Sequence, residues 1–232
     1  MKLKDFVAAY GQPYSSMLGI NLKSKRNEDV VKWFLAAILY SKPIRESSAT
    51  RTYQCFEKQG ITTARRIVAA GWDRLVSILD EGGYTRYDFS TADKLLEVFG
   101  NLEKLYGGDL NKLYEASGDA AELEANLRRL GKGIGDTTVS IFLRDLKHIW
   151  PKAEPRPTPL VAIALKRLGI RDLKQHAKKH RIDPVRLETA LVRYSKLFLK
   201  KRKRMRIVGL GRNGVPRLHV FPREPHRCHE LS

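Results

Sequence analysis

Residues 130–139, LGKGIGDTTV, decide the fold of this chain, because they place three glycines between two apolar, helix-spaced segments. Gly131, Gly133 and Gly135 predict a tight turn whose backbone N–H groups are exposed at the start of a helix. Such groups, backed by the helix dipole, bind a phosphate without reading its base. Apolar residues that could pack the two helices together flank the turn, at Leu130, Ile134, Val139 and Phe142. The segment predicts a helix-hairpin-helix that grips a phosphodiester; a purely structural turn is the alternative.

Outward from this turn, apolar residues at helical spacing account for almost everything up to residue 200. The expected helices cover residues 28–40, 50–59, 62–71, 74–81, 91–106, 119–130, 137–149, 161–169, 171–180 and 184–200. We expect N-caps at Thr62 or Thr63, at Asp73 and at Asp183. Residues 28–40 are apolar nearly all round, as in a core helix. Four prolines between positions 151 and 159 predict an extended connection. The chain is therefore expected to be all-α.

The charge of the chain points to a polyanionic partner. The formal net charge is +19, and residues 160–232 hold 20 Lys and Arg against 5 Asp and Glu, which leaves +15 in the C-terminal third. Such an excess favours nucleic acid as the partner; a ribosomal-style basic protein is the alternative. No apolar stretch approaches the roughly 20 residues that span a bilayer. Two cysteines, Cys55 and Cys228, provide neither a disulfide framework nor four iron–sulfur ligands.

With these residues the chain resembles the endonuclease III (HhH-GPD) superfamily of helix-hairpin-helix DNA glycosylases, whose hairpin reads Leu-Pro-Gly-Val-Gly followed by Lys-Thr-Ala. The resemblance extends from about Glu28 to Gly169 and includes the segment GGYTRYDFSTADKLLEVF and the helix end Lys166-Arg167-Leu168-Gly169. It implies a two-lobed helical fold with DNA in the cleft. It also implies that a base is flipped into a pocket and its N-glycosidic bond cleaved, since that bond is unreachable inside the stack.

The chain departs from the family at the catalytic positions. Thr137 stands where bifunctional members have a Schiff-base lysine, so we expect no lyase activity from that position. The family's aspartate would fall near residue 155 when counted from the lysine position, and at Thr158 when counted back from the Arg-Leu-Gly helix end. Neither position holds an aspartate. Glu154 is the only carboxylate in the proline-rich connection and is the candidate water-activating base; an exposed loop carboxylate is the alternative. Asp136 and Asp145 are weaker candidates.

Other residues are candidates for DNA contact. The resemblance places Tyr84, Arg86 and Tyr87 in the turn beside the base pocket, where packing aromatics would fit equally well. Lys42 and Arg45 fall where family members fill the hole left by the flipped base, with a solvated loop as the alternative. The expected backbone contacts are Gly131, Lys132, Gly133, Gly135, Thr137 and Thr138 in the hairpin, and Lys200, Lys201, Arg202, Lys203 and Arg204 in the run KKRKRMR.

The sequence thus predicts a helical domain over residues 1–200, with the helix-hairpin-helix at about 120–149, and a basic tail over 201–232. The leading function is a monofunctional DNA glycosylase of base-excision repair, and the rival is an inactive relative that senses lesions or DNA structure. We expect a cytoplasmic, nucleoid-associated monomer that binds damaged or modified duplex DNA and no membrane. We expect no metal site at His219, His226, Cys228 and His229, and no cofactor apart from a monovalent cation that the hairpin could hold.

Overall fold

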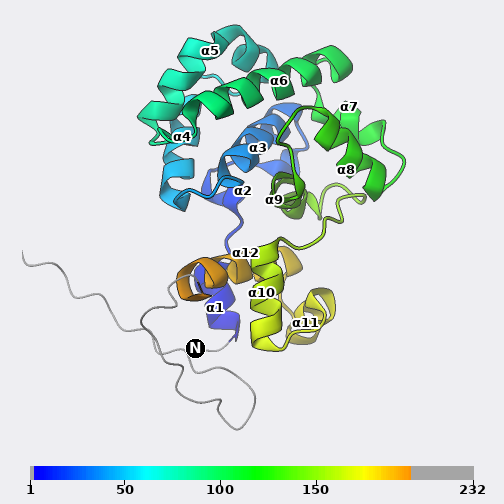
Figure 1. Ribbon diagram of the computed structural model, residues 1–232. Coiled ribbons are helices and arrows are strands. Elements are labelled where there is room, and N and C mark those ends of the chain that lie inside the picture. Colours follow the sequence, from blue (N-terminus) through cyan, green and yellow to red (C-terminus); the bar gives the residue numbers. More distant parts are fainter. Residues whose placement is uncertain (1–2, 200–232) are drawn as a thin grey trace, which may run out of the picture.

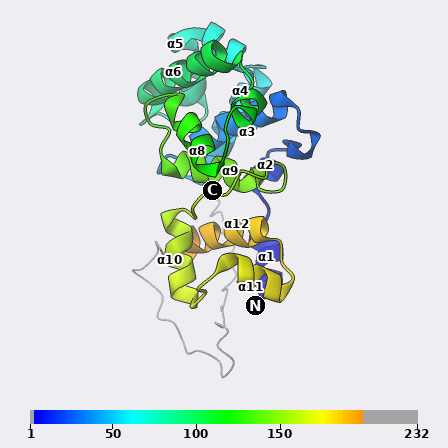
Figure 2. The same ribbon diagram turned by 90° about the vertical axis from the view of Figure 1, so that its right-hand side faces the viewer.

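The computed structural model describes residues 3–199, and every regular element within this range is a helix. The all-α prediction is confirmed for these residues. The helices form two groups, which Figure 1 and Figure 2 show from two directions. Each group surrounds an apolar core of its own.

The larger group is contiguous in sequence and is centred on α3 (Asn27–Tyr40). Residues 30–39 of α3, apart from Lys32, are almost completely buried, which confirms the core helix expected from its apolar sequence. The other members of the group are α2 (Tyr14–Met17), η1 (Leu22–Ser24), α4 (Glu46–Lys58), α5 (Ala64–Glu81), α6 (Asp88–Tyr106), α7 (Leu110–Glu115), α8 (Ala120–Arg129) and α9 (Asp136–Leu146).

The smaller group combines the first described helix with the last ones. Its members are α1 (Leu3–Tyr10), α10 (Pro159–Leu168), α11 (Leu173–His180), α12 (Pro184–Tyr194) and the π-helical turn η2 (Ser195–Leu199). The rings of Phe6 on α1 and Tyr194 on α12 meet edge to face, with centroids 6.1 Å apart. Sequence patterns did not predict that α1 would complete the core of this group.

Local sequence signals explain most helix ends. Thr63 caps α5 by accepting a hydrogen bond from the Arg66 N–H, and Asp183 caps α12 in the same way, both as predicted. The chain leaves the helical conformation at Gly71 (φ 71°, ψ 172°), as expected, so α5 consists of two helical stretches joined across a kink. The N-cap expected at Asp73 is wrong, because the break lies at Gly71 and Asp73 already belongs to the second stretch. The helix expected from residue 50 starts at Glu46.

The proline-rich segment after α9 connects the two groups without forming a helix, as predicted. It runs back along α9, where the Ser140 hydroxyl donates a hydrogen bond of 2.8 Å to the Arg156 carbonyl. Thr158 ends the segment as the N-cap residue of α10, and Pro159 follows at the first helical position.

Candidate nucleic-acid interface

Two helices and a tight turn occupy the predicted hairpin. Helix α8 ends at Arg129, residues 130–135 turn back, and α9 starts at Asp136. Gly133 has φ 89°, a left-handed conformation that side chains rarely adopt. The apolar residues flanking the turn are buried as expected, at Leu130, Ile134, Val139 and Phe142. Lys132, Gly133, Gly135 and Thr137 are exposed, whereas Thr138 is buried.

Helix α6 holds the hairpin through three polar side chains, which we call the hairpin anchor: Lys94, Glu97 and Asn101. Lys94 Nζ donates to the Gly133 carbonyl at 2.8 Å, and Asn101 Nδ2 donates to the Leu130 carbonyl at 2.8 Å. Glu97 Oε1 accepts from the Lys132 N–H at 3.0 Å. The spacing of three and then four residues puts all three side chains on one face of α6. The anchor therefore fixes the backbone of the turn.

The glycines let the hairpin approach α6 closely. A Cβ at Gly131 would lie 2.7 Å from Val98 Cγ2, and a Cβ at Gly133 would lie 2.7 Å from Lys94 Cε. Sequence reasoning explained these glycines by the turn alone and missed the anchor. The available signal was the spacing of these three polar residues along one face of the amphipathic α6.

The N-terminus of α9 presents free backbone donors. Gly135 is the N-cap residue in extended conformation (φ −98°, ψ −177°), and no side chain caps the helix. The first helical hydrogen bond runs from the Val139 N–H to the Gly135 carbonyl at 3.1 Å. Within residues 3–199, the N–H groups of Gly135, Asp136 and Thr137 have no acceptor. The exposed Asp136 carboxylate is paired with Arg128 at 2.9 Å, which offsets its charge at this end of the helix.

Cationic side chains gather beside the hairpin, and we call Lys42, Arg86 and Lys94 the cationic cluster. Lys42, in the loop after α3, is near enough to Lys94 for its positive charge to act on the Lys94 ammonium. The Tyr87 ring lies 5.6 Å from Lys42 Nζ and 5.7 Å from Arg86 Cζ, measured to its centroid. Burial and the neighbouring Lys42 ammonium lower the pKa of Lys94 to about 8. Lys94 contacts the hairpin and neighbours Lys42, and the Tyr87 ring lies near both Lys42 and Arg86.

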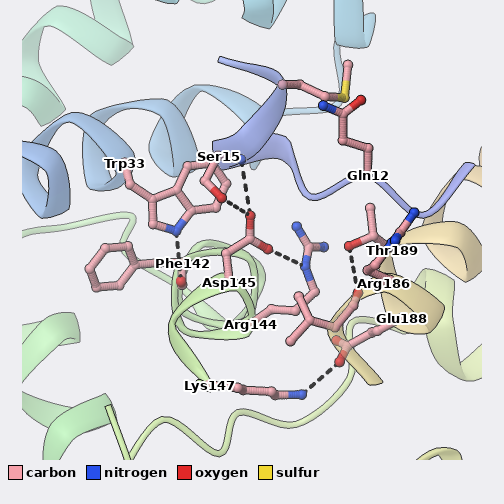
Figure 3. Close-up of polar contacts among 12 residues, drawn as sticks. Gln12, Ser15, Trp33, Phe142, Arg144, Asp145, Lys147, Arg186, Glu188 and Thr189 are labelled. Carbon is pink, nitrogen blue, oxygen red and sulfur yellow. Dashed lines mark hydrogen bonds and ion pairs between the residues drawn. The ribbon is translucent and has the colours of Figure 1, made fainter. Parts of the chain in front are cut away.

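Figure 3 shows a second polar region, where α9 of the larger group meets α12 of the smaller one. The Asp145 carboxylate accepts from the Ser15 N–H at 3.1 Å and the Ser15 hydroxyl at 2.8 Å, and it pairs with Arg144 Nε at 2.9 Å. Lys147 Nζ contacts Glu188 Oε2 on α12 at 2.7 Å. Asp145, a weaker acid candidate from sequence, is therefore saturated by structural contacts.

The predicted catalytic residue lies in the connection between the groups. Glu154 is exposed, and its Oε1 is 2.8 Å from Nζ of the exposed Lys174 on α11. The hydrogen bond and the positive charge of Lys174 hold the pKa of Glu154 below its usual range. Thr158, at the alternative aspartate position, is buried, and its hydroxyl has no hydrogen-bond partner among the described residues.

The remaining candidates separate into core, surface and undescribed residues. Tyr84 is buried, and its hydroxyl donates to the Leu39 carbonyl, so its ring packs in the core, the alternative considered for this position. Arg45 is exposed at the start of α4. Outside the described residues lie Lys200, Lys201, Arg202, Lys203, Arg204, His219, His226, Cys228 and His229. Between residues 3 and 199, no group of three His, Cys, Asp or Glu side chains could hold a metal ion.

Comparisons with protein-family models, curated proteins and solved structures found no significant match to this chain. None of the helices in the described part is long and apolar enough to cross a membrane. The resemblance of the hairpin to the DNA glycosylases therefore remains a proposal, to be argued from the site itself.

Proposed function

We propose that this chain is a DNA-binding protein of base-excision repair, which grips a phosphodiester of duplex DNA with its hairpin. One observation carries the proposal: among the described residues, the N–H groups of Gly135, Asp136 and Thr137 at the start of α9 have no acceptor, and the hairpin anchor holds this turn in place. Amides fixed before binding lose little conformational freedom when a phosphate arrives. They contact backbone rather than bases, so this grip is independent of sequence.

The charges near the hairpin support the same partner. Lys42 and Lys94 adjoin the turn, and the chain as a whole carries +19. A polyanion with closely spaced phosphates can engage the hairpin and the cationic cluster together. We propose further that the two groups of helices correspond to the two lobes of the HhH-GPD fold.

The enzymatic form of this proposal is a monofunctional glycosylase that flips a damaged or modified base and hydrolyses its N-glycosidic bond. Glu154 would activate the water, and its ionised form is the one that a general base requires. Thr137 has no amine, so no Schiff base forms at that residue.

The alternative is a protein that binds lesions or unusual DNA structures without cutting the glycosidic bond. One observation favours it: Lys174 occupies a Glu154 oxygen and lowers the pKa of Glu154, which makes this carboxylate a weaker base. The two forms share the grip on DNA and differ only in base release.

The proposed contact between the hairpin amides and a phosphate is tested by removing a single backbone N–H. Asp136→Pro removes the N–H at the first helical position, where proline is well tolerated, and the extended Gly135 suits a following proline. Asp136→Ala removes the same carboxylate and keeps the N–H, so it is the matched control. By fluorescence anisotropy with a labelled duplex, we expect Asp136→Pro to bind at least about fivefold more weakly than Asp136→Ala. Equal affinities would refute the hairpin grip.

Base release is tested with duplexes carrying deaminated, oxidised or alkylated bases, followed by hot alkali. Alkali-labile sites that are formed by the wild type and lost in Glu154→Gln support the glycosylase. DNA binding without release from any substrate supports the alternative. Borohydride should trap no covalent adduct, and an adduct would contradict the absence of a Schiff base.

A further inference from the structure

Lys42 and Lys94 form a pair of like charges from two different elements. Lys42 follows α3 and Lys94 lies in the second turn of α6; the Lys42 charge acts on the Lys94 ammonium, and Lys94 Nζ donates to the Gly133 carbonyl at 2.8 Å. No carboxylate of residues 3–199 forms an ion pair or hydrogen bond with either ammonium group. Glu97, one turn further along α6, accepts from the Lys132 N–H instead. The repulsion within the pair is therefore not offset by a neighbouring acid.

The ammonium groups of Lys42 and Lys94 keep donor protons that the fold does not use. Lys94 uses one of its three protons on the Gly133 carbonyl. Lys42 is half-buried, no described carboxylate or carbonyl accepts from its ammonium, and its Nζ lies 5.6 Å from the centroid of the Tyr87 ring. Arg86, which is exposed, adds a third cation on the same ring. An anion at the pair would meet unused donors of two ammonium groups, and Arg86 adds positive charge at the Tyr87 ring that Lys42 also faces.

We propose that the Lys42–Lys94 pair, with Arg86 beside it, binds a phosphoryl group, namely the phosphate next to the one held by the hairpin amides. The assignment of DNA as the source of this phosphate rests on the proposed function. Gly133, which holds Lys94, and Gly135, which starts the amide site, are two residues apart, so the chain between them spans at most about 7 Å. Along the helix axis, one DNA strand carries a phosphate about every 3.4 Å, so two neighbouring phosphates can reach two sites this close together.

The anion site itself is tested without DNA. Side-chain NMR signals of Lys42 and Lys94 are followed as inorganic phosphate is added, with sodium chloride at matched ionic strength as the control. We expect both lysines to shift saturably in phosphate and to stay unchanged in chloride. Lys104, exposed near the end of the same helix, should not shift. Equal responses of all three lysines would overturn the site.

Binding of the pair to DNA is tested with variants that each remove one positive charge. Lys42→Met should weaken duplex binding at least about fivefold more than Lys104→Met, because only Lys42 would touch a phosphate. Lys94→Met should weaken duplex binding as well, but it also removes the hydrogen bond to the Gly133 carbonyl. Lys42 bonds no backbone group of the described chain, so Lys42→Met is the variant that tests phosphate binding.

The outcomes separate this inference from the proposed function. If the wild type binds DNA but phosphate moves neither lysine and Lys42→Met behaves like Lys104→Met, the inference fails and the hairpin grip stands. If phosphate moves both lysines but the wild type does not bind DNA, the phosphoryl site stands and DNA as its source is refuted.

Discussion

The Lys94 side chain fills the space that a Cβ on Gly133 would need, and its Nζ donates a hydrogen bond of 2.8 Å to the Gly133 carbonyl. One lysine thus sets the residue type at the turn and holds the backbone there. The hairpin and the cationic cluster are consequently coupled, since both depend on the same side chain.

Gly133→Ala should disrupt this arrangement. The new Cβ would meet Lys94 Cε at 2.7 Å in a left-handed conformation, so we expect a loss of about 1–3 kcal/mol in the free energy of unfolding. Gly100→Ala, inside α6 with no atom near its Cβ, should instead gain about 0.5–1 kcal/mol. Urea unfolding of both variants checks the contrast, and a stabilised Gly133→Ala would contradict the observed packing.

DNA affinity should fall as the pH rises through about 8, the pKa of Lys94. The protonated amine attracts phosphate, so the attraction is complete well below this pH and lost above it. Removing the neighbouring charge in Lys42→Met raises the pKa of Lys94 and moves the loss to higher pH. Anisotropy titrations from pH 6.5 to 9.5 at constant salt measure the shift. A profile in Lys94→Met as steep as that of the wild type would assign the pH dependence to another group.

The contact between Lys147 and Glu188 should contribute to joining the two groups. Glu188 is buried, and its Oε1 has no hydrogen-bond partner in the described chain. Lys147→Met would remove the cation that contacts Glu188 and leave the buried Arg144 as its neighbouring positive charge, which should destabilise the protein by up to roughly 3 kcal/mol. The double variant Lys147→Met/Glu188→Leu should recover much of this loss, because it removes both charges.

The exposed Glu154–Lys174 pair provides the control for that experiment. Breaking it with Lys174→Met should cost no more than about 1 kcal/mol, since solvent screens both partners. A comparable loss in Lys147→Met and Lys174→Met, measured by chemical denaturation, would show that burial does not distinguish the two contacts.

If Glu154 is the catalytic base, Lys174 also sets the pH range of base release. Lys174 lowers the pKa of Glu154, so the base stays ionised to a lower pH than an isolated glutamate. In Lys174→Met the pKa rises, and the acid side of the pH–rate profile should move to higher pH. Single-turnover rates between pH 3.5 and 7 measure this movement. An unchanged acid side would exclude Glu154 as the titrating group.

The structural features that could be predicted from the sequence are those that depend on residues close together in the chain. The periodicity of α3, the cap at Asp183 and the apolar residues around the hairpin all follow from spacing within about one to three helical turns. The break at Gly71 was also predicted, whereas the direct joining of the two stretches was not, because a glycine that separates two helices and a glycine that kinks one helix look alike in sequence.

The candidate site was predictable only in part, because its residues meet through the tertiary fold. Lys42 and Arg86 were identified from a resemblance, whereas Lys94 belongs to a helix whose spacing only indicated amphipathicity. Lys94 gains its role from the hairpin, some 40 residues later in the chain, which packs against the same face of α6. Sequence alone did not reveal that pairing.

The smaller group draws α1 from one end of the described chain and α10 to α12 from the other. During synthesis the larger group, which is contiguous, can fold as soon as α9 and the segment after it have emerged. Phe6 and Val7 then have to wait for the residues of α12, more than 170 positions later, before their apolar surface is covered. A nascent or truncated chain that lacks α12 would therefore expose this surface, which makes the late arrival of α12 a step at which aggregation or chaperone binding competes with folding.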